Sequence, residues 1–514
     1  MSLTVAKILK GVEQLNYELN TETRLVRAGQ KETQETEPIM KRHEWLASLS
    51  VAKLVQAQLN RARDPDERER LERLYFTCTG LYTYHKLARL DDQLQTGLAN
   101  HKVRLGDEQV PFYNLSPRLQ NEPDFNKREA LGAAMDNVHR KFNPEKLALL
   151  QRDLQILRRD LGYKSYIAYC EAQKQFDYEK FIVILAESGH RTALLFRDHM
   201  ARWVAEKMGR PFRTPEGKPA LHRWHVSHLM KLGEFDARFS KKEMLPTLFG
   251  SLRRMGMDLK AKKNIKLDLE ERDKKNPRAC LFAAKIPQEI HLLLKPVGGL
   301  QDYEVFMHEA GHALHCGYSD AKLPYEYRHL SRSNALTEIY AFLLQNITLD
   351  ALWLEETMHM SRKLAERIRY YRVLCDLYMY RRYIGKLRAE FAFFRQHEQK
   401  GQAALANGKT YAQTLTEHTG FIYQPSGYLF DMDEGFYSAD YLRAWVGEAQ
   451  LADYLRRNFS ERWWADKRAG RFLVDLWRSA CTQEAEQVLG GLGCPALDTA
   501  CLERRFTELE SLEA

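Results

Sequence analysis

The chain has 514 residues, of which 44% are hydrophobic and 29% charged, and its formal net charge is +9. A chain of this length exceeds the size at which a single hydrophobic core stops growing, so we expect two or three lobes. The basic residues form no dense block interleaved with aromatic residues, which argues against a surface for nucleic acids.

The compartment is predicted from what the sequence lacks. No stretch approaches 18 consecutive apolar residues, and residues 1–20 have no continuous apolar core of the signal-peptide type. The eight cysteines form no C-x-x-C pair and are expected to be reduced thiols. We therefore expect a cytoplasmic protein that does not associate with membranes.

Residues 1–210 are predicted to form an N-terminal helical lobe. Apolar residues recur there at three- and four-residue intervals in the segments 3–25, 37–61, 66–98 and 145–161. Prolines such as Pro144 punctuate these segments, and we expect only helices in this part of the chain. Nothing in the lobe carries chemistry by itself. Its expected role is to form one wall of a cleft.

A loop rich in proline and glycine at 211–221 is the best boundary, and it would begin a second lobe over 211–514. Between about 264 and 296 the hydrophobic period changes from helical to alternating, which predicts a small antiparallel sheet. The small side chains of Ala283 and Ala284 would let a peptide backbone lie against one strand of this sheet. A structural hairpin without a ligand is the alternative interpretation.

The next segment, about 302–316, is predicted to be a helix that contains the pattern H-E-x-x-H. His308 and His312 are then one turn apart on one helix face, where both imidazoles can reach the same divalent ion. Glu309 would project beside the ion, where its carboxylate could take a proton from water. Gly311 weakens a helix, which is most easily explained if another segment must pass close to the histidines.

A catalytic zinc site usually has three protein ligands, so a third donor is expected from another element. Glu338 lies in the first turn of the next predicted helix, over 334–349, among apolar neighbours that would bury it. Because a buried carboxylate needs a cation, Glu338 is the predicted third ligand. His315 is interpreted as a packing or supporting residue and not as a ligand. Zinc is inferred over manganese or cobalt from the ligand types.

Two tyrosines follow a long loop at 420–433. Tyr437 and Tyr441 are four residues apart on a predicted helix, so both phenols can face one cleft, although two aromatic residues at this spacing are also compatible with simple packing. In a hydrolytic site a phenol could donate a hydrogen bond to an oxyanion.

At these residues the chain resembles the thimet and oligoendopeptidase F group of zinc metallopeptidases. The resemblance rests on 305–315, on Thr337-Glu338 and on 436–441, and the segment 277–296 looks like the β-hairpin on the substrate side of that family. It is specific from about residue 224 to 497 and only architectural before that. Two departures are a longer gap between His312 and Glu338 and, at 428–433, the absence of a histidine that the family tends to have.

The resemblance implies a mainly α protein in which two helical lobes flank a deep substrate cleft, with one Zn²⁺ per chain. It favours an endo-acting oligopeptidase for short, unfolded peptides. A carboxypeptidase or dipeptidase on a related scaffold is an alternative, and it would need a basic residue such as Arg328 or Arg332 to anchor a terminal carboxylate. A peptide-binding protein that has kept its metal is a third possibility, against which an intact Glu309 argues. The sequence does not fix the oligomeric state.

Overall fold

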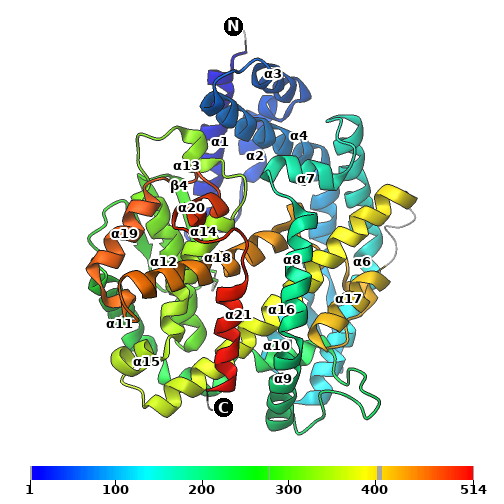
Figure 1. Ribbon diagram of the computed structural model, residues 1–514. Helices are drawn as coiled ribbons and strands as arrows, with labels where there is room; N and C mark the ends of the chain where they lie inside the picture. The colour runs from blue at the N-terminus through cyan, green and yellow to red at the C-terminus, as the bar shows by residue number, and fades with distance from the viewer. Residues whose placement is uncertain (1–2, 277, 402–407, 513–514) are drawn as a thin grey trace.

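The computed structural model describes residues 3–276, 278–401 and 408–512. The chain folds mainly into α-helices, as predicted (Figure 1). The helices of the N-terminal part are α1 (Val5–Arg27), α2 (Thr36–Arg42), α3 (Leu49–Leu59), α4 (Pro65–Asn100), α5 (Phe112–Asn121), α6 (Phe125–Arg159), α7 (Tyr166–Lys174), α8 (Tyr178–Arg191) and α9 (Ala193–Met208).

The prediction of only helices before residue 210 is wrong at one place. A hairpin of β1 (Lys102–Leu105) and β2 (Glu108–Pro111) lies between α4 and α5. Its two-residue turn begins at Gly106, whose φ of 61° belongs to the left-handed region that such turns require. The alternation of Val103 and Leu105 just before a Gly-Asp pair was the available signal.

The expected start of a helix at residue 145 is also wrong, because α6 runs unbroken through Pro144. Proline inside a helix costs about 3 kcal/mol. On either side of it, however, Phe142 and Leu154 are buried, and the burial of such side chains contributes free energy of similar size. The segment predicted at 37–61 is instead divided between α2 and α3, and Ser48 caps α3 by accepting from the Val51 backbone N–H.

The second part of the chain surrounds the pattern H-E-x-x-H. A loop at 209–222, within which Arg213 and Pro219 form an isolated bridge, leads into it as predicted. Its elements are α10 (Arg223–Leu229), α11 (Lys241–Arg254), β3 (Ile265–Asp268), β4 (Cys280–Lys285), β5 (Glu289–Leu293), α12 (Leu300–Tyr318), α13 (Tyr325–His329), α14 (Ala335–Gln345), α15 (Ala351–Met358), α16 (Arg362–Lys400), α17 (Lys409–Thr419), α18 (Tyr437–Asn458), α19 (Lys467–Trp477), α20 (Ala485–Gly491) and α21 (Ala500–Thr507).

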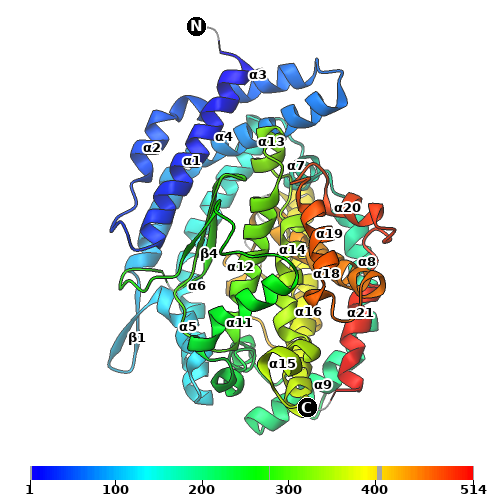
Figure 2. The ribbon, with the colours of Figure 1, turned by 90° about the vertical axis from the view of Figure 1, so that its left-hand side faces the viewer.

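The sheet beside α12 is mixed, which corrects the prediction of an antiparallel sheet. Its strand order is β3-β5-β4: β5 pairs antiparallel with β4 but parallel with β3. The long connection from β3 carries the chain past the position of β5, so that β4 becomes an edge strand, close to α1 and α12 in Figure 2. Of the segment expected to form the substrate-side hairpin, Pro277 lies outside the described residues.

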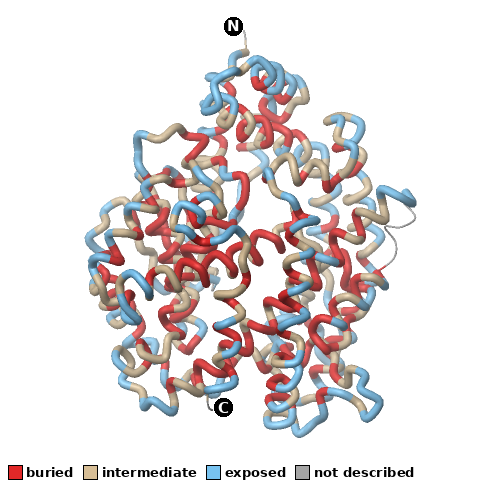
Figure 3. The backbone as a smooth tube through the Cα atoms, viewed as in Figure 1, coloured by how far each residue is buried: buried red, intermediate tan, exposed pale blue. Residues whose placement is uncertain are grey.

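The core is centred on the helices that carry His308, His312 and Glu338. Figure 3 shows buried residues concentrated along the middle of the molecule. The largest cluster of buried apolar side chains joins α12, α14, α16 and α18. It also includes Phe181 and Trp203, from before residue 210. The division into lobes at 210 and 211 stays a prediction. Among the described residues, no helix is both long and apolar enough to cross a membrane.

Candidate metal centre

The helices α12 and α14 pack so closely that only glycine fits at their contact. A Cβ atom placed on Gly311 would lie 2.6 Å from the Ala341 Cα and 2.7 Å from the Tyr340 carbonyl oxygen. Such distances are far below ordinary van der Waals contact. The prediction that another segment passes close to the histidines is therefore confirmed, and the passing segment is α14, the helix that carries Glu338.

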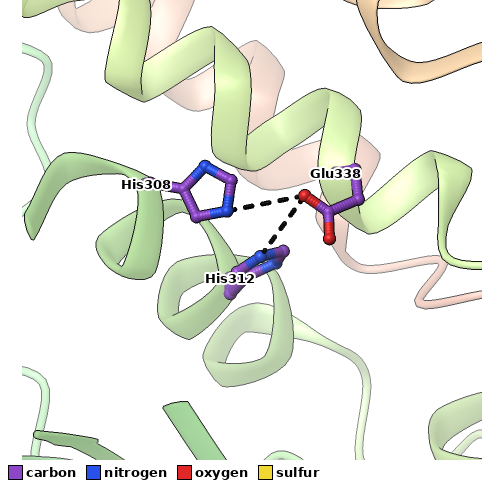
Figure 4. A group of neighbouring side chains, drawn as sticks. All are labelled: His308, His312 and Glu338. Atoms are coloured by element: carbon purple, nitrogen blue, oxygen red, sulfur yellow. Dashed lines mark ion pairs between the residues drawn. The ribbon is translucent and has the colours of Figure 1, made fainter. Parts of the chain in front are cut away.

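This contact brings together three side chains that could hold a metal ion (Figure 4). The Nε2 atoms of His308 and His312 lie 3.5 Å and 3.8 Å from the same carboxylate oxygen, Oε2 of Glu338. The three potential ligand atoms are all within 4.8 Å of one another. Two imidazoles and one carboxylate form a donor set typical of catalytic zinc.

The other ring nitrogen of each histidine is held by α14. Nδ1 of His308 lies 2.9 Å from Gln345 Oε1, and Nδ1 of His312 lies 2.8 Å from Thr337 Oγ1. An amide oxygen can only accept, so Nδ1 of His308 carries the proton and its Nε2 offers a lone pair. Gln345 is a site residue that was not predicted from the sequence. Its spacing of seven residues from Glu338 on one helix face was the signal.

The electrostatics of the site favour a cation. Glu338 is buried, and its Oε2 has no hydrogen-bond donor among the described residues. Burial raises the pKa of Glu338 to about 7, although the hydrogen bond from Tyr437 opposes this shift. Burial also lowers the pKa of His308 to about 4 and holds that of His312 well below its usual range. A divalent ion would supply the charge that these buried donors lack, so the residues fit zinc.

Glu309 lies outside the ligand group, next to the edge strand β4. Burial raises the pKa of its carboxyl to about 7, while the Arg278 charge and a hydrogen bond from the Leu281 backbone lower it. A carboxylate with a pKa near neutrality is suited to accept and release a proton.

The two predicted tyrosines are adjacent, but they have different partners. The Tyr437 hydroxyl donates a 2.9 Å hydrogen bond to Oε1 of Glu338. The Tyr441 ring lies 4.8 Å from that of Tyr437 and stacks on Trp445. Tyr437 therefore contacts a candidate ligand directly, whereas the Tyr441 ring belongs to an aromatic wall.

Ala283 and Ala284 lie on the edge strand β4, as their predicted role requires. Ala283 pairs with Ile290 of β5, while Ala284 falls at an irregularity in the register. Ala284 is buried and Ala283 half-buried. No contact of the described residues tests whether a peptide lies against them, and their role stays a prediction.

In the stretch at 428–433, the carboxylates belong to ion pairs with α16. Arg382 contacts Asp431, and the Lys386 ammonium lies 2.7 Å from Asp433. The Asp433 backbone N–H also donates to Glu390. These contacts tether the loop before Tyr437 to the long central helix.

A cavity of about 910 Å³ opens beside Tyr437. Its walls come from helices α4, α6 and α7 on one side and from the segment just before α14 and the loop before α18 on the other. Tyr437 and Asp440 belong to its lining. The cavity therefore reaches Tyr437, which contacts the candidate ligand Glu338, and it is large enough to hold several residues of a peptide.

Comparison with known proteins supports the fold. No protein-family model matches the chain, and no curated protein matches it. Among solved structures, the chain is similar to the crystal structure of a putative peptidase from Chlamydophila abortus, with a TM-score of 0.66 and 15% sequence identity. The match covers 99% of this chain and 90% of the other. At this identity the likeness shows a shared fold alone, and activity must be argued from the site.

Proposed function

We propose that the protein is a zinc-dependent peptidase that hydrolyses short, unfolded oligopeptides. The observation that carries this proposal is the buried Oε2 of Glu338, which has no hydrogen-bond partner among the described residues and faces Nε2 of both His308 and His312, with Glu309 nearby. The shared fold with a putative peptidase agrees with it.

The proposed mechanism divides three roles among five side chains. His308, His312 and Glu338 would hold the ion, which when bound supplies Lewis acidity that polarises a carbonyl and acidifies water. The Glu309 carboxylate takes the proton of the attacking water and later returns it to the leaving amine. The Tyr437 hydroxyl, which already points into the site toward Glu338, turns its proton to the developing oxyanion.

The cavity and the edge strand favour peptides as substrates. A peptide backbone can pair with β4 at the side away from β5, next to Glu309, while its flanking residues enter the 910 Å³ cavity. We propose endo-cleavage, since the cavity beside Tyr437 has room for several residues of the peptide beyond the cleaved bond. We also propose a cytoplasmic location, in agreement with eight cysteines that are all free thiols.

The carboxypeptidase alternative is disfavoured by the contacts of its candidate anchors. Arg332 is buried and bound to Glu69 and Glu72, at 2.7 Å and 2.6 Å. Arg328 donates to the backbone oxygens of Leu323 and Ile286. Both guanidinium groups are thus engaged within the protein. A binding protein without activity would not need the proton acceptor Glu309.

The test is to incubate the zinc-loaded protein with a mixed peptide library and to read cleavage positions by mass spectrometry. Glu309→Gln keeps the shape of the side chain but cannot accept a proton, so we expect zinc occupancy near wild type with hydrolysis reduced by orders of magnitude. Internal cuts are expected. Cleavage confined to the C-terminal residue would favour the carboxypeptidase, and equal turnover by Glu309→Gln would refute the assigned base.

A further inference from the structure

A chain of hydrogen bonds leads from the N-terminal helices to the candidate ligand Glu338. The Lys174 ammonium, at the end of α7, donates to Oδ2 of Asp440 at 2.9 Å. The same oxygen accepts from the backbone N–H of Asn334 at 3.1 Å, and the carbonyl of Asn334 accepts from the N–H of Glu338 at 3.0 Å. Lys174 is thus connected to the backbone of a ligand through two intermediates.

Asn334 is the N-cap residue of α14, but its own side chain makes no capping hydrogen bond. The Asp440 carboxylate, which comes from α18, accepts a hydrogen bond from the backbone N–H of this cap residue. It also places a negative charge at the N-terminus of α14, the positive end of the helix dipole. Thr337 and Glu338, which contact His312 and the ligand site, lie in the first turn that follows. The position of Asp440 therefore sets the position of this turn.

The Lys174 ammonium is the nearest positive charge to the buried Asp440 carboxylate. Its side chain is 1% exposed and that of Lys174 is 7% exposed. The second oxygen of Asp440 accepts no hydrogen bond among the described residues, and Arg443, at 3.6 Å, is bound more closely by Glu486 at 2.7 Å. Loss of Lys174 would leave a poorly compensated buried carboxylate, which is costly enough to displace it.

The same helix holds the start of α18 at a second point. The Tyr166 hydroxyl, at the beginning of α7, accepts from the Gly435 N–H at 2.7 Å. Gly435 and Phe436 both have left-handed backbones, with φ of 61° and 51°, immediately before Tyr437. Figure 1 shows α18 crossing the middle of the molecule toward α7. The helix α7 therefore fastens the strained turn that presents Tyr437.

We propose that Lys174 is a positioning residue for the metal centre: through Asp440 and Asn334 it fixes the first turn of α14, and with it Glu338 and Thr337. This inference rests on the proposed function, because the metal is part of that proposal. Lys174 also lines the 910 Å³ cavity, so the test must separate positioning from contact with a peptide.

The test compares two single variants, and then two double variants, by zinc affinity without peptide, by hydrogen exchange of metal-free protein over 334–338, and by kcat and KM. Lys174→Met should bind zinc about 10- to 100-fold more weakly, as expected when a group supporting a ligand is lost. Exchange at 334–338 should be faster and kcat lower, with KM little changed. Lys146→Met, which removes the same charge from the same cavity, should leave zinc affinity and exchange unchanged.

Two double variants keep the test decisive if Lys174→Met folds poorly. Lys174→Met/Asp440→Asn removes the buried charge but keeps an oxygen for the Asn334 N–H, so zinc affinity should recover. Lys174→Met/Asp440→Leu is also uncharged but lacks that oxygen, and its zinc affinity should stay low.

Unchanged zinc affinity in Lys174→Met, or equal affinity in the two double variants, would overturn the proposal. A rise in KM alone would also overturn it, because it would make Lys174 a contact for the peptide. If the wild type binds zinc but cleaves no peptide, the proposed peptidase fails while zinc affinity and exchange still decide the role of Lys174.

Discussion

The two carboxylate oxygens of Glu338 have different contacts in the candidate site. Oε1 of Glu338 accepts a hydrogen bond from Tyr437, whereas Oε2 faces the two imidazoles and could bind the same ion. One carboxylate thus joins the metal centre to the group that would stabilise an oxyanion. Substitutions of single residues can therefore separate metal binding from catalysis.

Removal of either histidine tests the ligand set. His308→Ala or His312→Ala should lose stoichiometric zinc and all activity, while far-UV circular dichroism stays that of a mainly helical protein, since a core this large does not depend on one ion. The measurement is metal content after gel filtration. A variant that retains one zinc per chain would remove that histidine from the ligand set.

Substitution of the two tyrosines is expected to have different effects, because Tyr437 contacts Glu338 and the Tyr441 ring stacks on Trp445. Tyr437→Phe should lower kcat by roughly 10²-fold with little change in KM, if its hydroxyl acts mainly in the transition state. Tyr441→Phe keeps the stacked ring and serves as the matched control, for which a smaller loss is expected. Steady-state kinetics decide the point. A larger loss of kcat in Tyr441→Phe would exchange the assigned roles.

At the scale of elements, the site is a consequence of how two helices pack. The pattern H-E-x-x-H and the burial around Glu338 were readable from the sequence, because helical period and apolar neighbours are local properties. Gly311 within a helix also predicted that another segment lies close to the histidines. The partner of Tyr437 and the parallel pairing of β3 with β5 were not readable, because both depend on segments far apart in the chain.

Gly311→Ala tests this packing. The added Cβ would meet the α14 backbone at 2.6 Å, which a side-chain movement cannot relieve, so the helices must separate. We expect a loss of stability of about 1 to 3 kcal/mol and weaker zinc binding. Gly250→Ala is the control, because a Cβ there, within α11, meets nothing within 4 Å and should be neutral or stabilising. Chemical denaturation and zinc titration measure both effects, and wild-type zinc affinity in Gly311→Ala would contradict the packing argument.

At the scale of the whole molecule, the N-terminal helices form part of the cavity and also reach the metal-binding helix. The predicted cleft wall is thus more than a passive surface, since Lys174 and Arg332 connect the two parts through buried ion pairs. The sequence could predict helices here but not these pairs, because charged residues on a helix are usually solvated.

Removal of the metal should lower the stability of the whole protein, because an ion that binds only the folded state shifts the folding equilibrium. Chelation is expected to abolish hydrolysis and to lower Tm without loss of helical structure, and zinc at 100 times its Kd should restore about 2.7 kcal/mol of stability. The measurement is a thermal melt with and without zinc. His308→Ala is the control, and an equal zinc-dependent rise of Tm in that variant would place the stabilising ion elsewhere.

The packing of α12 against α14 also has a consequence for the order of events during synthesis. Both imidazoles, their supporting groups Thr337 and Gln345, and Glu338 all lie between residues 300 and 345, on two neighbouring helices. Tyr437 is 99 residues further along the chain than Glu338. At about 5 to 20 residues per second, a ribosome would release the complete ligand set seconds before the tyrosine. A nascent chain would thus present all three candidate ligands before it has either Asp440, which we infer to fix Glu338, or the hydroxyl that we assign to the oxyanion.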